Sequence, residues 1–171
     1  IKHANPCGVA TGGSLLVGAN GSDSWAGSTS LVNATVGGSN SFAISGSTSL
    51  TASNQTRQTA ETSGVTIGGL LAIGANLASA SAGSVTLASI DNGNTGSVGS
   101  ALSVLATGHD QTYADAEAGS GGIIAGAAAV ASTRNLSNTQ ALLGGGTSTA
   151  ALSTATNGRM EVRADHIATF N

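Results

Sequence analysis

The feature that most constrains this chain is a recurring block of two glycines, a short apolar cluster and a Gly-Ala pair. It occurs at 12–20 as Gly-Gly-Ser-Leu-Leu-Val-Gly-Ala-Asn and again at 68–76 as Gly-Gly-Leu-Leu-Ala-Ile-Gly-Ala-Asn. A looser copy, Gly-Gly-Ile-Ile-Ala-Gly-Ala, stands at 121–127. Self-similarity at a steady spacing is typical of proteins built from stacked units that contact only their neighbours.

Three further markers recur in the same order along the chain. They are Ala26-Gly27-Ser28 with 82–84, Ser49-Leu50-Thr51-Ala52 with 103–106 and 161–164, and Glu61 with Glu117. The shifts between copies are about 53 to 58 residues, which is long for one turn of a solenoid and suggests two or three turns. We therefore predict one domain at 12–171 with about three degenerate repeats, namely 12–67, 68–120 and 121–171, after an atypical segment at 1–11.

Within each repeat the apolar residues alternate with period two, which indicates β-strands of three to six residues. Examples are 65–67, 85–90, 102–104 and 160–162, and they are separated by Gly and Asn clusters that suit turns. The Ala-rich stretches 70–81 and 123–132 have some helical propensity. Their flanking glycine pairs and lack of helix caps favour strands.

The composition restricts the kind of core that this chain can build. Only 8% of the residues are charged and 2% are aromatic, whereas 40% are hydrophobic and a single proline is present. A disordered Gly/Ser linker is the alternative, but disorder usually combines low hydrophobicity with high net charge. We favour a parallel β-helix whose thin interior accepts Ala, Ser, Thr and Val. Neither end carries an obvious cap, so the chain is expected to be part of a longer array or to stack end to end.

Residues 12–171 resemble the leukotoxin-type and filamentous-haemagglutinin-type repeats of large bacterial exoproteins. The likeness rests on the Gly-Gly-apolar-Gly-Ala blocks and on the closing segment 162–171, which looks like the phrase that precedes such a block. The resemblance implies secretion to the cell surface, an all-β, right-handed parallel β-helix (β-solenoid), and a role in adhesion or in a surface fibre. It supplies no active site that could be transferred.

The opening segment has a different character from the repeats. Residues 2–8, Lys-His-Ala-Asn-Pro-Cys-Gly, resemble a signature of the AICAR transformylase that acts in purine synthesis, which would give Lys2 and His3 roles in formyl transfer. That likeness ends at Ala10, and the repeats offer no pocket for a folate, so we do not expect an enzyme. We predict instead that Lys2, His3, Asn5, Pro6 and Cys7 form an edge or an arm that takes part in assembly.

Other candidate sites are better explained as surface features. His109 and His166 fall near equivalent repeat positions, offset by one residue, but a metal site needs more ligands than these. The stretch 91–96 is a turn rather than a calcium loop, and Asp115 and Glu117 are expected on a solvated strand face. We expect no catalytic residues, cofactor or metal. The net charge of −3, with no basic run, argues against nucleic-acid binding, and 67–80 is too short to span a membrane.

The sequence thus predicts a structural segment of a secreted adhesin or extracellular filament, which joins neighbouring copies or repeats through its open ends. The first alternative is a binding module for a carbohydrate or an ice surface, for which Thr147-Ser148-Thr149 has the required Thr-x-Thr form. Its partners would include host or cell-surface glycans. The second alternative is a formyltransferase fragment that uses Lys2 and His3.

Overall fold

The computed structural model describes residues 2–144, 151–154 and 158–171, and these form strands and turns without a helix. Consequently, no described segment is a helix that could cross a membrane. The strands are β1 (Lys2–Ala4), β2 (Cys7–Ser14), β3 (Val17–Ser28), β4 (Leu31–Val36), β5 (Ser41–Ile44), β6 (Thr48–Gly68), β7 (Leu71–Ala82), β8 (Val85–Ile90), β9 (Thr95–Val98), β10 (Ala101–Gly121), β11 (Ile124–Asn135), β12 (Asn138–Leu143), β13 (Ala151–Thr154) and β14 (Arg159–Phe170).

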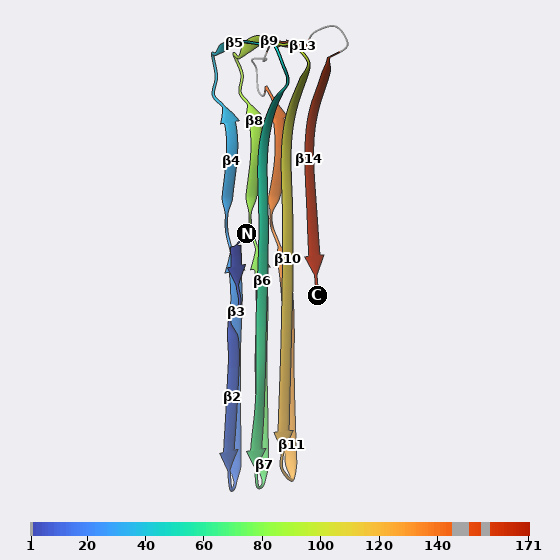
Figure 1. Ribbon diagram of the computed structural model, residues 1–171. Helices are drawn as coiled ribbons and strands as arrows, with labels where there is room; N and C mark the ends of the chain where they lie inside the picture. Colours follow the sequence, from blue (N-terminus) through green and yellow to red (C-terminus); the bar gives the residue numbers. More distant parts are fainter. Residues whose placement is uncertain (1, 145–150, 155–157) are drawn as a thin grey trace.

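The protein is all-β, and its strands lie in four parallel sheets that the chain visits in a fixed order. Sheet A contains β1, β2, β6, β10 and β14; sheet B contains β3, β7 and β11; sheet C contains β4, β8 and β12; and sheet D contains β5, β9 and β13. The long strands β6 and β10 run along most of the elongated molecule, and both termini lie partway along its length (Figure 1). Sheet D crosses one end, where the chain returns to sheet A.

One passage of the chain through sheets A to D, here called a circuit, takes 53 to 58 residues. Thr48 of β6 pairs with Leu102 of β10, and Val17 of β3 pairs with Leu71 of β7, both at a separation of 54 residues. The expectation of two or three turns per repeat is therefore wrong, because each repeat is one circuit. The error came from strand length: β6 and β10 each have 21 residues instead of three to six.

The strand register confirms the repeat unit, although some sequence markers are displaced. Ser103 pairs with both Ser49 and Glu161, as the second set of markers predicts. Gly12, however, pairs with Thr66 rather than with Gly68, so that marker is displaced by two residues. A shift of two leaves every side chain on the same face of its strand, and for this reason the sequence pattern hardly distinguishes the two alignments.

The interior is narrow and consists largely of small side chains, as predicted. Near sheet D, Leu102 and Val104 of sheet A pack with Ile90 and Val98, while the opposite half is lined by alanines from sheets A and B. Polar side chains are also buried along the interior. They include Ser24, Asn54, Thr56, Gln58, Thr62, Thr66, Asn76, Ser84, Thr86, Asp110 and Thr112.

Several apolar residues point outward, which reverses the usual pattern of a half-buried strand. Val65 and Ile67 are exposed on β6, while Thr66 between them is buried. The turn from β2 to β3 exposes Leu15, which is 92% accessible. Alanine and threonine fill the thin space between sheets A and B, so the larger aliphatic side chains occupy the outer faces.

The ambiguous Ala-rich stretches are strands, as predicted. Residues 71–82 form β7, and 124–135 form β11, each paired in parallel with the strand of the adjacent circuit. In β7 the inward residues include Ala72, Ala78 and Ala80, whose side chains are completely buried. Alternating alanines can approach sheet A closely, and this packing outweighs their modest helical propensity.

Candidate functional site

Polar side chains gather on the outer face of sheet A, at the middle of its length. We call this set the Tyr113 face; it consists of His3, Asn5, Arg57, Thr59, Glu61, Gln111, Tyr113, Asp115, Thr169 and Asn171. The parallel register places them in rows across the strands: His3 beside Arg57 and Gln111, Thr59 beside Tyr113, and Glu61 beside Asp115. Successive residues of a strand point to opposite faces, so every second residue contributes to this surface.

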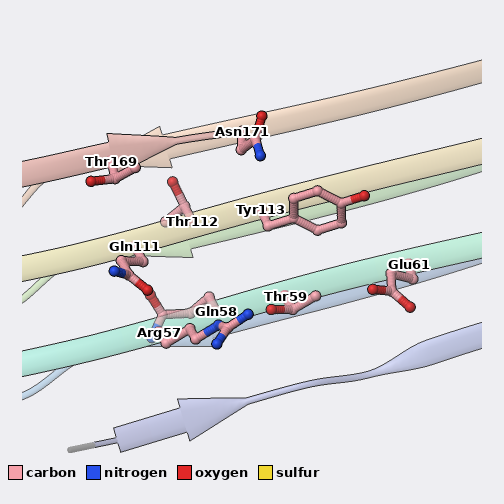
Figure 2. A pocket seen from close by; sticks show the side chains of 9 residues that line it. All are labelled: Arg57, Gln58, Thr59, Glu61, Gln111, Thr112, Tyr113, Thr169 and Asn171. Atoms are coloured by element: carbon pink, nitrogen blue, oxygen red, sulfur yellow. The ribbon is translucent and has the colours of Figure 1, made fainter.

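Two grooves of about 400 Å³ each lie on the Tyr113 face, and they share Arg57, Thr59 and Glu61. One extends over β10 to the end of the last strand and reaches Tyr113 and Asn171, as Figure 2 shows. The other extends over the first strand and is lined by His3, Ala4 and Asn5. Together they form a depression that crosses four neighbouring strands.

The backbone fixes the edges of this depression. The amide of Asn171 donates to the carbonyl of Thr112 at 3.0 Å, and the carbonyl of Asn171 accepts from the amide of Ala114 at 3.1 Å. On the other side, the amide of Glu61 donates to the carbonyl of Pro6 at 3.3 Å. The side chains of the Tyr113 face are therefore mounted on a hydrogen-bonded sheet rather than on a loop.

Acidic neighbours set the electrostatics around Tyr113. The negative charge of Asp115 raises the pKa of the Tyr113 hydroxyl above its ordinary value of 10.0, with smaller contributions from burial, Glu61, the hydrogen bond to Asp115 and Glu117. The phenol is therefore protonated at neutral pH and acts as a hydrogen-bond donor. Among the residues that the structure describes, no carboxylate lies within ion-pair distance of the Arg57 guanidinium.

A second polar cluster lies inside the molecule, around the carboxyl group of Asp110. The Asp110 side chain is 1% exposed. Its Oδ1 accepts hydrogen bonds from the Thr56 hydroxyl and, at 3.4 Å, from the Ser84 hydroxyl, and its Oδ2 accepts one from Asn135 Nδ2 at 3.3 Å. These partners come from sheet A and from the corners next to sheets B and C, so Asp110 ties the two walls of the interior together.

His166 extends this cluster toward the surface. Its Nε2 lies 3.6 Å from Asp110 Oδ2, and its Nδ1 lies 3.1 Å from the Thr139 hydroxyl. Gly108 makes room for this arrangement, because a Cβ at that position would collide with both Thr139 Oγ1 and His166 Nδ1. A Thr-His-Asp chain of contacts has the composition of a nucleophilic triad, but the aspartate here is held by several other groups inside the structure. Its architecture is that of a buried structural network.

The predicted assembly segment is part of sheet A. Lys2 and His3 lie in β1, and Cys7 begins β2; both strands continue the 54-residue register against β6. The break between them is at Asn5 and Pro6, where the proline carbonyl also accepts a hydrogen bond from the Ser24 hydroxyl at 3.0 Å. Cys7 is a free, exposed thiol. The role of these five residues in assembly, like the formyl-transfer alternative, stays a prediction.

The other sequence-predicted positions are found as follows. His109 and Gly108 occupy successive positions, and His166 pairs with Gly108, so the predicted one-residue offset between the histidines is confirmed. Residues 91–94 form a turn in which Gly93 has a positive φ of 78°. Within the described ranges, no three His, Cys, Asp or Glu side chains gather as metal ligands. Thr147, Ser148 and Thr149 lie outside the described residues.

Sequence reasoning missed both the Tyr113 face and the Asp110 cluster. Their members are 54 residues apart along the chain, so only the correct register brings them together. Comparison with protein-family models, with curated proteins and with solved structures finds no match for this chain.

Proposed function

We propose that this chain is a structural segment of a right-handed parallel β-solenoid, in a secreted bacterial adhesin or extracellular filament. The observation that carries the proposal is the constant register, in which each circuit lies on the preceding one through four parallel sheets. Such stacking lets each added circuit use the same backbone hydrogen bonds along one axis. Secretion and adhesion are inferred from the resemblance to exoprotein repeats.

Side-chain ladders with the same spacing support the stacking. Asn40 donates both its backbone amide and its side-chain amide to Asn94 Oδ1, each at 3.2 Å. The Ser22 hydroxyl donates to Asn76 Oδ1 at 2.9 Å, again across 54 residues. Each ladder satisfies a polar group of one circuit with the next circuit, so the structure favours repetition along the axis.

Open sheet edges provide the means of extension. In the part of the chain that the structure describes, β11 pairs with β7 on one side and with no strand on the other. The amides of Ile124, Leu136 and Asn138 donate toward the preceding circuit. Since backbone groups alternate in direction along a strand, the amide of Ala129 points away from the sheet and can pair with an incoming strand. Addition of strands at this edge would join neighbouring copies or repeats.

A pair of proline variants tests strand addition. Ala129→Pro removes an amide that faces the open edge, so it should leave the folded chain intact and reduce end-to-end association. Ala128→Pro is the matched control, because the Ala128 amide faces β7; it should lower stability by about 3 kcal/mol. Association is measured by sedimentation velocity and negative-stain electron microscopy. Equal association of the folded Ala129→Pro variant and the unchanged chain would refute strand addition at this edge.

Fibre diffraction tests the architecture itself. Aligned assemblies should give a reflection at roughly 4.8 Å along the fibre axis, because the strands lie across that axis and stack along it. The same spacing perpendicular to the axis would contradict the proposed direction of growth. Particles that stay monomeric at all concentrations would exclude the filament role.

A further inference from the structure

We propose that the Tyr113 face is a binding site for a neutral oligosaccharide, which lies across the strands of sheet A. The site requires only the register of these strands, so it does not depend on filament formation. Its members are exposed or half-buried side chains of β1, β6 and β10, together with the end of the chain at Asn171.

The first argument is the concentration of functional groups. The chain has one Tyr, five Lys or Arg, and eight Asp or Glu in 171 residues. The tyrosine, one of the five cations and two of the eight carboxylates lie on the Tyr113 face: Tyr113, Arg57, Glu61 and Asp115. In contrast, the outer face of sheet B carries apolar side chains such as Ile73 and Ile124. A solvated surface with no ligand gives no reason for such clustering.

The second argument is the chemistry of these side chains. Sugars present apolar C–H faces and closely spaced hydroxyl groups, so a sugar site needs a flat aromatic surface and planar polar groups. Tyr113 provides the ring. Arg57, Glu61, Gln111 and Asn171 provide donors and acceptors in planar pairs, which match neighbouring hydroxyl groups. The described residues offer no side-chain hydrogen-bond partner to Gln111 or Arg57, so these groups are available to a ligand.

The third argument is shape. The two grooves are continuous through Arg57, Thr59 and Glu61, and they extend from His3 to Asn171. Four strands spaced about 4.8 Å apart give a length of roughly 14 Å, which suits a short oligosaccharide better than one sugar. The ligand would therefore lie along the direction in which the strands stack, so that each circuit contributes equivalent positions.

Charge selects the class of glycan. Glu61 and Asp115 are direct neighbours in the register, and Glu117 lies on the same strand face as Asp115, while Arg57 is the cation of this surface. The local excess of negative charge would repel an acidic glycan or a nucleic acid. A neutral glycan meets no such barrier and can accept hydrogen bonds from Arg57 and the protonated Tyr113.

Isothermal titration calorimetry with the full chain tests the site. The probes are maltotetraose, cellotetraose and chitotetraose as neutral tetrasaccharides, and tetragalacturonate as an acidic one. At least one neutral probe should bind, and Tyr113→Ala should raise its Kd by about tenfold because the ring surface is lost. Tyr113→Phe should retain most of the affinity. Arg57→Ala should also weaken binding.

Trp25→Ala is the matched control, since Trp25 is an aromatic residue 64% exposed on the outer face of sheet B. It should leave the Kd unchanged. Three results would overturn the proposal: no binding of any neutral probe, preferential binding of tetragalacturonate, or a loss of affinity in Trp25→Ala as large as in Tyr113→Ala. Circular dichroism of each variant establishes that the sheets are intact.

Discussion

The Gln58 side chain offers a sharp test of how this narrow interior is stabilised. Gln58 is 0% exposed, and both its Nε2 and its Oε1 lack a hydrogen-bond partner. Its partner in the next circuit is Thr112, whose hydroxyl is also unpaired. Replacing Gln58 with methionine keeps the length of the side chain and removes both buried polar atoms. We therefore expect Gln58→Met to stabilise the fold.

The magnitude follows from the desolvation of the amide. Burying an amide without hydrogen bonds costs about 1–3 kcal/mol by mutational measurement, and an apolar replacement of similar shape loses less than about 1.5 kcal/mol through imperfect packing. The net gain should be about 1–2 kcal/mol. For a chain of this length, 1 kcal/mol shifts the Tm by about 2–4 °C, so the Tm should rise by about 2–8 °C.

Thermal unfolding followed by circular dichroism, together with urea unfolding, measures the effect. Gln55→Met is the control, because Gln55 lies on the outer face of the same strand and should change stability by no more than about 0.5 kcal/mol. A Gln58→Met variant that is less stable than the unchanged chain would refute the reasoning. That result would mean that ordered water between Gln58 and Thr112 pairs the amide in the folded state.

Three further predictions concern other polar groups. Asp110→Ala should lower the free energy of unfolding by about 2–3 kcal/mol in urea titrations, because Thr56, Ser84 and Asn135 lose their acceptor; a neutral effect would contradict the role of this hub. Gly108→Ala should destabilise by about 1–3 kcal/mol through its collision with Thr139, and a double variant with Thr139→Ala should recover part of that loss, whereas strict additivity would exclude the collision. Absorbance titration should place the Tyr113 pKa above 10.0, and Asp115→Asn should lower it; an unchanged midpoint would exclude the electrostatic cause.

Much of the fold could be predicted from local patterns. The alternation at 102–104 and 160–162 predicted strands that β10 and β14 contain, and the Ser49 marker predicted their register. The small side chains predicted for the interior are found there. These features could be predicted because strand geometry relates each residue only to its neighbours along the chain, with a period of two.

Other features depended on contacts that the alternation does not specify. The same pattern at 65–67 places Thr66 inside and Val65 outside, since an alternating strand has two faces and the pattern does not say which one meets the opposite wall. The strand lengths in sheet A were also underestimated. Polar residues such as Asn54 and Thr56 interrupt the apolar pattern, yet they continue the strand toward the interior.

The sequence by itself determined that this chain is a repetitive all-β protein with small inward side chains, because composition and period-two alternation exclude a conventional core. The tertiary structure decided that one repeat is one circuit, that Asp110 meets Thr56 and His166 inside, and that Tyr113 meets Arg57 and Glu61 outside. These groupings follow from a register of about 54 residues. A displacement of two residues would preserve the inward and outward pattern but separate the partners, so only the packed sheets define them.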